Sequence, residues 1–281
     1  MSRPFNLVDV FAETPLAGNP LAVVFDAEGL DTDAMQRIAR WLNLSETVFL
    51  LAPSRPGADY RARIFTLERE LPFAGHPTLG ACHAWLSRGG TPARAGQVVQ
   101  DCGAGLVTIR RGEGRNAFAA PPLLRGGPVD AADLAEVAAI LRISPEEIVE
   151  ARWVDNGPGW IGVMLASAEA VLVLDPARDH PRRMDIGVVG EHGAGGEAAF
   201  ELRAFFSDQF GALREDPVTG SLNASVAQWL LGEGHAEAPY VAAQGTKLGC
   251  AGRIHISQDA DGQVWVGGSA RTIVSGVIDL D

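Results

Sequence analysis

The sequence predicts an α+β protein built from two similar halves, each a curved β-sheet wrapped around a central helix. Two observations favour this fold class. One turn motif occurs twice, at an offset of about half of the 281-residue chain. The other segments are mostly short and β-prone, with few helical patterns between them and no regular alternation of strand and helix. Because an internal repeat indicates a repeated structural unit, we expect two pseudo-symmetric halves.

The repeated motif reads as an apolar strand, a charged loop, Pro-x-x-Gly, one polar residue and a helix. Its copies are residues 63–86 and 203–230, which match at Pro72 and Pro217, Gly75 and Gly220, and His76 and Ser221. The first turn of a helix has unpaired N–H groups and partial positive charge. A glycine there lets a ligand approach the backbone closely. We therefore expect both helix ends to serve one site between the halves, which binds a carboxylate or a phosphate.

The first half opens with two strands joined by a turn-forming segment. A helix is expected next, from a cap at Asp31, Thr32 or Asp33 to about Leu42, because apolar residues recur on one face. Residues 98–120 read as two or three short strands broken by Gly and Arg. The remaining expected elements are strands at 5–11, 21–25, 46–51 and 62–66, and a helix at 77–86 that follows the first repeated turn.

A stretch rich in Gly and Pro, residues 123–130, is the expected junction between the halves. The predicted domains are residues 1–125 and 126–281. We expect that the last strand can cross back to the first half. The second half is expected to hold helices at 131–141 and 221–231, and strands at 148–154, 160–165, 200–206, 253–257, 264–268 and 272–278. The first strand-to-helix turn lacks Gly-x-Gly-x-x-Gly, which disfavours a Rossmann fold.

Composition narrows the class of protein. The formal net charge of −12 argues against nucleic-acid binding, which needs clustered Lys and Arg. The sequence holds neither an apolar run of about 18 residues nor a secretory signal pattern, so we expect no membrane span and a cytoplasmic location. The scattered cysteines and histidines lack metal-ligand spacing, so we expect no metal. Cys82, beside His83, reads as a packed helix residue rather than a nucleophile.

Glu46 is the first candidate for chemistry. It lies in the segment LNLSETVFL, directly ahead of an apolar strand. A carboxylate at the mouth of a buried strand is partly desolvated, which suits it to general acid/base work near neutral pH. The equally weighted alternative is an exposed glutamate at a strand end, or one that caps a turn.

The repeated turns supply three further candidates. His76 is placed to shuttle a proton or to bond a local backbone group. Asp216 is either a turn starter before Pro217 or a group that positions His76 or the substrate. Ser221 is either an N-cap or a donor to a carboxylate. Neither turn holds a cysteine, which disfavours a racemase with paired thiols, and Ser221 lacks the Gly-x-Ser-x-Gly context of a hydrolase.

Four segments together carry a family resemblance: PLAGNPLAVVFDAEGL, LNLSETVFL, ELPFAGHPTLGA and EDPVTGSLNA. In this order and spacing they closely resemble the PhzF-like family, the phenazine biosynthesis isomerase-like proteins. The resemblance extends over nearly the whole chain. The segment QGTKLGCAGRIHI also resembles the family, but it has Cys250 and Ala251 where Arg-Pro is more usual.

The resemblance implies the diaminopimelate epimerase fold, with two pseudo-symmetric halves and the active site between them. It implies that Glu46 is the general acid/base and that His76, Asp216 and Ser221 surround a small carboxylate substrate. The implied carboxylate-binding groups are the backbone amides of Gly75, His76, Gly220 and Ser221, with Asn156 and Gly157 as weaker members of the site. The family's reaction moves a proton on a dihydro-hydroxyanthranilate without a cofactor, and its members are commonly homodimers.

Two other functions stay open. An epimerase or racemase of an amino or hydroxy acid needs two bases on opposite faces of one carbon, and Glu46 with His76 or Asp216 could supply them. A non-catalytic carboxylate-binding protein with the same fold is the second alternative. The intact set of candidate residues argues against the latter.

Overall fold

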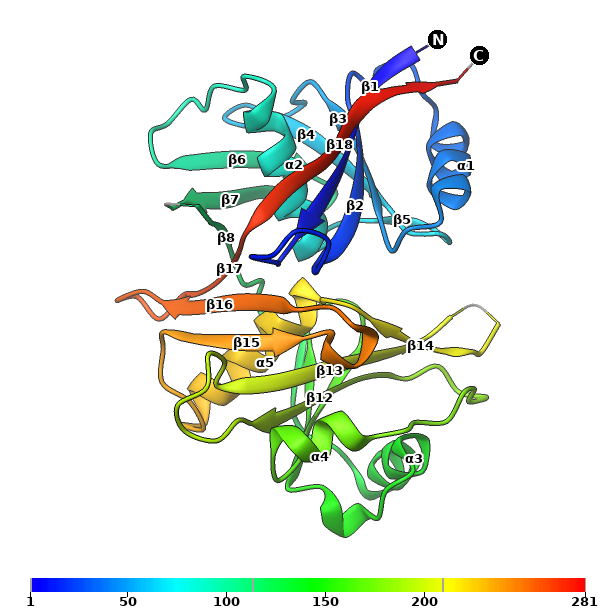
Figure 1. The fold of residues 1–281 in the computed structure, drawn as a ribbon, viewed down its shortest axis with the longest axis vertical. Coiled ribbons are helices and arrows are strands. Elements are labelled where there is room, and N and C mark those ends of the chain that lie inside the picture. The colour runs from blue at the N-terminus through cyan, green and yellow to red at the C-terminus, as the bar shows by residue number, and fades with distance from the viewer. Residues whose placement is uncertain (1, 113, 209, 281) are drawn as a thin grey trace. The chain divides into compact units, whose positions relative to one another are not determined.

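The computed structural model describes residues 2–112, 114–208 and 210–280. The chain divides into two compact units. Unit 1 consists of Met1–Ala119 and Gly267–Asp281, and unit 2 consists of Ala120–Val266. Each unit combines β-sheet with a few helices, as the sequence predicts (Figure 1). Within the described residues, no helix is long and apolar enough to cross a membrane.

Unit 1 is formed mainly by the first eight strands and two helices, and it also contains the last strand. The elements are β1 (Ser2–Val10), β2 (Asn19–Val24), α1 (Thr32–Leu42), β3 (Thr47–Leu51), β4 (Tyr60–Phe65), β5 (Glu70–Leu71), α2 (Gly75–Ser87), β6 (Gln97–Cys102), β7 (Gly105–Arg111), β8 (Asn116–Ala119) and β18 (Ala270–Asp279). β17 (Val264–Gly268) carries the chain from unit 2 back into unit 1.

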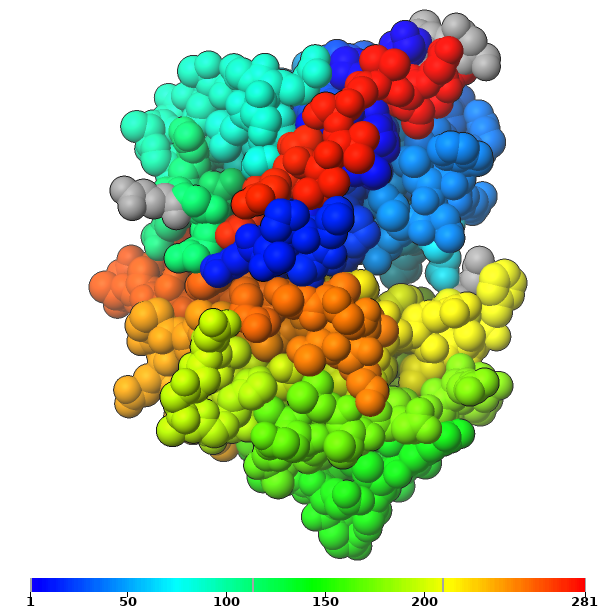
Figure 2. Space-filling model, in the orientation of Figure 1, coloured from blue at the N-terminus to red at the C-terminus, as the bar shows by residue number. Residues whose placement is uncertain are grey.

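The sheet of unit 1 mixes antiparallel and parallel pairs. β1 pairs antiparallel with β2 and β18, and β2 pairs parallel with β3. β4 pairs antiparallel with β3 and β5 but parallel with β6, and β6, β7 and β8 form an antiparallel meander. Figure 2 shows the red residues of β18 uncovered on this face of unit 1, beside the blue N-terminal residues.

The two helices of unit 1 differ in burial because they differ in sequence pattern. α1 has one apolar face, on which Met35, Ile38 and Ala39 are buried, and Asp31 caps its N-terminus. α2 is apolar on nearly all sides, and its residues from Gly75 to Cys82 are buried. α2 contacts β1, β2, β3, β4, β6, β8 and β18, so it is the central helix of this unit.

Unit 2 repeats the plan around a second buried helix, α5 (Gly220–Gly232). Its other elements are β9 (Arg125–Pro128), α3 (Ala131–Leu141), a 3₁₀ turn (Pro145–Glu147), β10 (Glu150–Asp155), β11 (Trp160–Met164), α4 (Ala168–Val173), β12 (Asp185–Glu191), β13 (Phe200–Ser207), β14 (Leu213–Asp216), β15 (Tyr240–Gln244), a second 3₁₀ turn (Thr246–Leu248) and β16 (Gly252–Gln258). Side chains from α3, α4, β11 and β12 form one apolar core cluster of unit 2.

The predicted repeat is present in the topology. In unit 1, β4 pairs antiparallel with β5, α2 follows, and β6 returns parallel to β4. In unit 2, β13 pairs antiparallel with β14, α5 follows, and β15 returns parallel to β13. In each copy an ion pair with two hydrogen bonds joins the two antiparallel strands. Arg63 of β4 pairs with Glu70 of β5, and Arg203 of β13 pairs with Glu215 of β14. The repeat is therefore structural.

One local expectation differs from the structure. Residues 125–128, which read as part of a Gly- and Pro-rich junction, form β9 and pair antiparallel with residues 152–155 of β10. The division between the units lies before this stretch, at Ala119 and Ala120. Strand pairing with β10 has overridden the weak local strand propensity of Gly and Pro.

Candidate active site

In unit 1, Glu46 and His76 lie side by side although 30 residues separate them in the sequence. Nδ1 of His76 lies 3.0 Å from Oε2 of Glu46, and Nε2 of His76 lies 3.1 Å from the backbone oxygen of Asn19. The His76 side chain is 3% exposed and that of Glu46 is 18% exposed. The histidine is thus held from both ring nitrogens, while the carboxylate keeps some access to solvent or ligand.

The local fold explains this meeting. Asn19 opens β2 and Glu46 directly precedes β3, and these strands run parallel. Parallel strands begin at the same edge of a sheet, so both residues lie at that edge. The first turn of α2 brings His76 there as its second residue.

The two contacts of His76 bear on which of its ring nitrogens donates a hydrogen bond. A backbone carbonyl only accepts, so Nε2 of His76 carries a proton and donates it to Asn19. Nδ1 then shares a hydrogen bond with Glu46 only if a second proton lies between them, on the carboxyl or on the ring. His76 is therefore placed to share a proton with the carboxyl group of Glu46.

In unit 2, Asp216 and Ser221 lie on either side of the second repeated turn. Oδ2 of Asp216 accepts a hydrogen bond of 2.6 Å from the Thr219 hydroxyl. Oγ of Ser221 accepts one of 3.1 Å from the indole N–H of Trp160. Nδ2 of Asn156 donates to the backbone oxygen of Ser221 at 2.8 Å. Asn156, one of the weaker candidates from the sequence, therefore contacts the backbone of Ser221 near the start of α5.

Gly157 has a different part in the structure. Its N–H donates to Oδ1 of Asp155, as does the N–H of Gly159, so these contacts shape the turn between β10 and β11. Its φ of 142° is one that side-chain-bearing residues rarely adopt. The contact of the Gly157 N–H thus shapes a turn, whereas that of the Asn156 side chain reaches Ser221.

The N-termini of the two central helices differ from those of the other helices. Side-chain oxygens of Asp31, Asp130 and Ser167 accept hydrogen bonds from the first turns of α1, α3 and α4. The N-cap residue of α2 is instead Ala74, whose side chain has no acceptor, and the hydroxyl of Thr219, the N-cap residue of α5, donates to Asp216. The first turns of α2 and α5 therefore keep the anion-binding capacity that a capping side chain would otherwise use.

Other reactive groups have structural surroundings. Cys82 is fully buried in α2, and burial raises the pKa of its thiol to about 12, so it is protonated at neutral pH. Burial also raises the pKa of Tyr60 well above its ordinary value. Across the described residues, no group of three or more His, Cys, Asp or Glu side chains is arranged to hold a metal ion.

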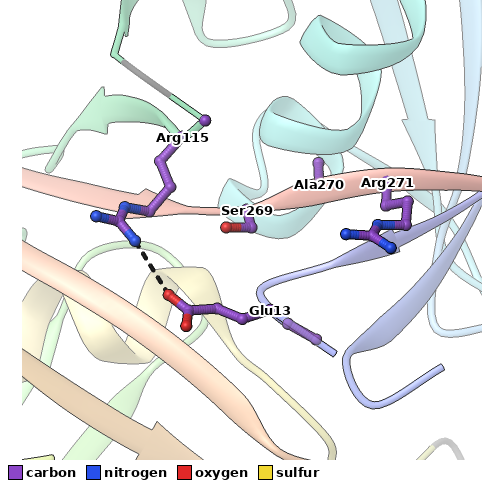
Figure 3. A pocket seen from close by; sticks show the side chains of 7 residues that line it. Glu13, Arg115, Ser269, Ala270 and Arg271 are labelled. Carbon is purple, nitrogen blue, oxygen red and sulfur yellow. Dashed lines mark hydrogen bonds and ion pairs between the residues drawn. The ribbon is translucent and has the colours of Figure 1, made fainter. Parts of the chain in front are cut away.

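A hollow of about 320 Å³ lies elsewhere in unit 1 (Figure 3). Arg115 and Glu13 form an ion pair of 3.0 Å at its wall, and Ser269 and Arg271 also line it. The ion-paired side chains are 44% and 56% exposed, so the pair contributes little to stability. The candidate catalytic residues do not line this hollow, which is therefore not their site.

Comparison with known proteins shows the family to which this chain belongs. The model of a family described as phenazine biosynthesis-like protein, PhzC-PhzF, matches residues 8–276. The chain belongs to this family. A trans-2,3-dihydro-3-hydroxyanthranilate isomerase of Pseudomonas aeruginosa is 32% identical over 269 residues, covering 92% of this chain and 91% of that protein. The expected PhzF-like resemblance is confirmed.

Two further relatives show the spread of names within similar chains. Antisense-enhancing sequence 1 of Schizosaccharomyces pombe is 33% identical over 292 residues, which cover 97% of each chain. A solved structure from Pseudomonas aeruginosa, described as a predicted epimerase, has a TM-score of 0.80 at 30% identity and covers 99% of this chain and 100% of that chain. This match over the whole length of both chains confirms the expected fold class.

Sequence reasoning did not select Asn19, Trp160 or Thr219, which the structure places against the candidate residues. Asn19 and Thr219 lie within two of the segments that carry the family resemblance, and Trp160 lies three residues after Gly157. Asn19 acts through its backbone oxygen, which no residue type reveals. Trp160 and Thr219 carried a weak signal, since a buried indole N–H and a hydroxyl beside a turn both need partners.

Proposed function

We propose that this protein is a cofactor-independent isomerase that moves a proton along an unsaturated small carboxylic acid, with Glu46 as the general acid/base. The observation that carries the proposal is the hydrogen-bonded Glu46–His76 pair, with its partly exposed carboxyl group. Family membership supports the reaction class, because a relative of similar length is named an isomerase of trans-2,3-dihydro-3-hydroxyanthranilate.

The proposed reaction begins with Glu46 as a carboxylate beside the His76 imidazolium. Oε2 is engaged by His76, so Oε1 takes the proton from a carbon next to the double bond. That C–H bond breaks and the electron pair shifts the double bond. The proton held by the partly exposed Glu46 carboxyl group exchanges with solvent, and Glu46 then returns a proton to the far carbon of the unsaturated system. The enzyme ends in its starting protonation state, and positioned acid/base catalysis of this kind contributes about 10²- to 10⁴-fold.

The substrate carboxylate is proposed to bind the free first turns of α2 and α5. The backbone N–H groups of Gly75 and His76 and those of Gly220 and Ser221 would donate to it. Asp216, Ser221 and Asn156 would complete the contacts of the substrate, and Gly157 would act only through the turn that carries Asn156. The support is the absence of a capping acceptor at Ala74 and the use of the Thr219 hydroxyl by Asp216.

An exchange experiment tests this function. The protein is incubated in D2O with trans-2,3-dihydro-3-hydroxyanthranilate and a panel of unsaturated, amino and hydroxy acids, and NMR follows deuterium at carbon. The proposal predicts deuterium and a shifted double bond with the wild type and neither with Glu46→Gln. Turnover that survives in Glu46→Gln would remove Glu46 from the mechanism.

Epimerisation of a chiral acid is the second candidate function. It is favoured by the structural relative described as a predicted epimerase at 30% identity. It would use Glu46 on one face of the carbon and His76 or Asp216 on the other. Deuterium at the chiral carbon with loss of optical rotation and no migration of the double bond would favour it over isomerisation.

We further propose that the protein forms a homodimer through β18. This strand is exposed on both faces from Ile273 to Val277, and it presents apolar side chains there. Exposed apolar strands of this kind mark association surfaces. Light scattering should give twice the 29.6 kDa chain mass, and Val277→Lys should yield the monomer. A monomeric wild type would contradict this proposal.

A further inference from the structure

Two fully buried glutamines, Gln100 and Gln244, lie on the strands that follow the central helices of the two units. Gln100 lies in β6, which is parallel to β4, and Gln244 ends β15, which is parallel to β13. β4 and β13 are the strands that lead into the repeated turns. A buried amide needs hydrogen-bond partners, so its partners identify what it holds in place.

In unit 2, all four hydrogen bonds of the Gln244 amide go to the turn and first helical residues between Asp216 and Asn223. Oε1 accepts from the backbone N–H of Thr219 at 3.0 Å and from Nδ2 of Asn223 at 2.7 Å. Nε2 donates to the backbone oxygen of Asp216 at 3.1 Å and to the Thr219 hydroxyl at 2.9 Å. A backbone N–H only donates and a carbonyl only accepts, so the orientation of this amide is fixed by its partners.

These bonds reach the carboxylate of Asp216. The Thr219 hydroxyl accepts from Gln244 and gives its own proton to Oδ2 of Asp216 at 2.6 Å. Gln244 thus restrains Asp216 twice, at its backbone oxygen and, through Thr219, at its side chain.

Unit 1 repeats part of this arrangement. Nε2 of Gln100 donates to the Thr78 hydroxyl at 3.0 Å, and that hydroxyl donates to the backbone oxygen of Ala74 at 2.8 Å. In unit 2, Nδ2 of Asn223 donates to the backbone oxygen of Thr219 at 3.0 Å. Thr78 and Asn223 are each the fourth residue of their helix, so in both units a glutamine holds the side chain that closes the first turn.

We propose that Gln244 is a positioning residue for Asp216 and the first turn of α5, and that Gln100 is its counterpart for the first turn of α2, which carries His76. The inference rests on the proposed function, which makes these turns the substrate-binding elements. Both glutamines are fully buried, so they act through the turns rather than on the substrate. A displacement of about 1 Å at a reacting group costs about 10²-fold in rate.

The test uses substitutions that remove the bonds and keep the volume. Gln244→Met removes the amide, and Thr219→Val removes the hydroxyl that links it to Asp216, while Thr219→Ser keeps a hydroxyl. Gln228→Met is the matched control. Gln228 lies further along α5, and its side chain donates to the backbone oxygen of Pro121 rather than to the first turn. The readouts are kcat and KM with trans-2,3-dihydro-3-hydroxyanthranilate, and amide hydrogen exchange at Thr219 and Gly220 without substrate.

We expect Gln244→Met and Thr219→Val to lower kcat by about 10-fold or more, with KM within about 3-fold of the wild type. Thr219→Ser should restore most of the turnover that Thr219→Val loses, and Gln228→Met should lose less than about 2-fold. Amide exchange at Thr219 should rise at least 10-fold in Gln244→Met, because its acceptor is gone. Equal losses in Gln244→Met and Gln228→Met, or no recovery with Thr219→Ser, would overturn the proposal.

Failure of the proposed function is recognised separately. If the wild type turns over no compound, amide exchange in the substrate-free protein still decides, and unchanged exchange at Thr219 in Gln244→Met contradicts positioning. If Gln244→Met does not fold, the comparison of Thr219→Val with Thr219→Ser gives the answer by kcat, or by amide exchange at Gly220.

Discussion

Nδ1 of His76 lies 3.0 Å from Oε2 of Glu46, and this contact joins the first turn of α2 to the start of β3. The opposite ring nitrogen is fixed by the backbone oxygen of Asn19. Since that oxygen only accepts, the ring cannot rotate its proton away from Asn19 without losing a bond. The geometry therefore holds the His76 ring in one orientation against Glu46.

His76→Gln tests this relationship. The amide can keep one hydrogen bond to Glu46 but cannot become a cation, so the carboxylate loses the charge-assisted hydrogen bond that the proposed reaction gives it. We expect kcat to fall by about 10²-fold or more with a smaller change in KM. Steady-state kinetics measure both, and His83→Gln is the control because His83 bonds Thr272 instead. An unchanged kcat in His76→Gln would contradict the role given to the pair.

Trp160→Phe tests the orientation of Ser221. The substitution keeps the buried ring but removes the indole N–H that donates to the Ser221 hydroxyl. A lost hydrogen bond is equivalent to about 1 kcal/mol, so we expect kcat/KM to fall by about 5-fold. Trp153→Phe, in the neighbouring strand β10 and packed against Arg125, should stay close to the wild type. Equal kinetics in both variants would argue against a role for Trp160.

Cys82 provides a prediction on pH and stability. Its pKa is raised to about 12 in the fold and is lower in the unfolded chain, so the unfolded state gives up this proton first as the pH rises. Its contribution to stability is therefore complete below about pH 9 and falls by up to about 1.4 kcal/mol per pH unit above it. Urea unfolding between pH 8 and 11 should show a shallower fall in Cys82→Ala than in the wild type.

The partly exposed Cys250 is the control for that experiment. Cys250→Ala should leave the alkaline slope as it is in the wild type. Iodoacetamide at pH 8 should modify Cys250 of the native protein and leave Cys82 intact. Rapid native-state alkylation of Cys82 would contradict the burial described for it.

The repeated ion pairs predict different costs in the two units. Arg203 and Glu215 are 4% and 12% exposed, whereas Arg63 and Glu70 are 16% and 36% exposed. Removing one partner of a buried pair costs about 3–5 kcal/mol, and an exposed pair contributes about 0–1 kcal/mol. Urea unfolding should therefore show a much larger loss for Arg203→Leu than for Arg63→Leu. Equal losses would contradict the burial difference.

The sequence patterns located the central elements but missed several short ones. α2 and α5 were predictable because each follows Pro-x-x-Gly with a long apolar run. β15 and the six-residue α4 were missed because they are too short to show a period. β9 contains Gly-Gly-Pro, and only its pairing with β10 makes it a strand. Tertiary contacts, rather than local propensity, determine such elements.

The candidate site was predictable as residue types and less so as contacts. The sequence singled out Glu46 and His76 separately, because a partly desolvated carboxylate and a helix-start imidazole each have a chemical rationale. Their hydrogen bond depends on the parallel pairing of β2 and β3, which spacing alone does not reveal. The Asn19 carbonyl was not predicted because backbone atoms carry no local motif. Gln244 opens the segment QGTKLGCAGRIHI, but the sequence does not reveal which groups its amide contacts.

The measurement that tests the central claim most directly is deuterium incorporation from D2O into trans-2,3-dihydro-3-hydroxyanthranilate, compared between the wild type and Glu46→Gln by NMR. Both proteins must first bind the compound, which ligand-detected NMR establishes. We predict deuterium at the carbon that gains a proton with the wild type and none with Glu46→Gln. Equal incorporation by both proteins, or none by a wild type that binds the compound, would contradict Glu46-dependent proton transfer on this substrate.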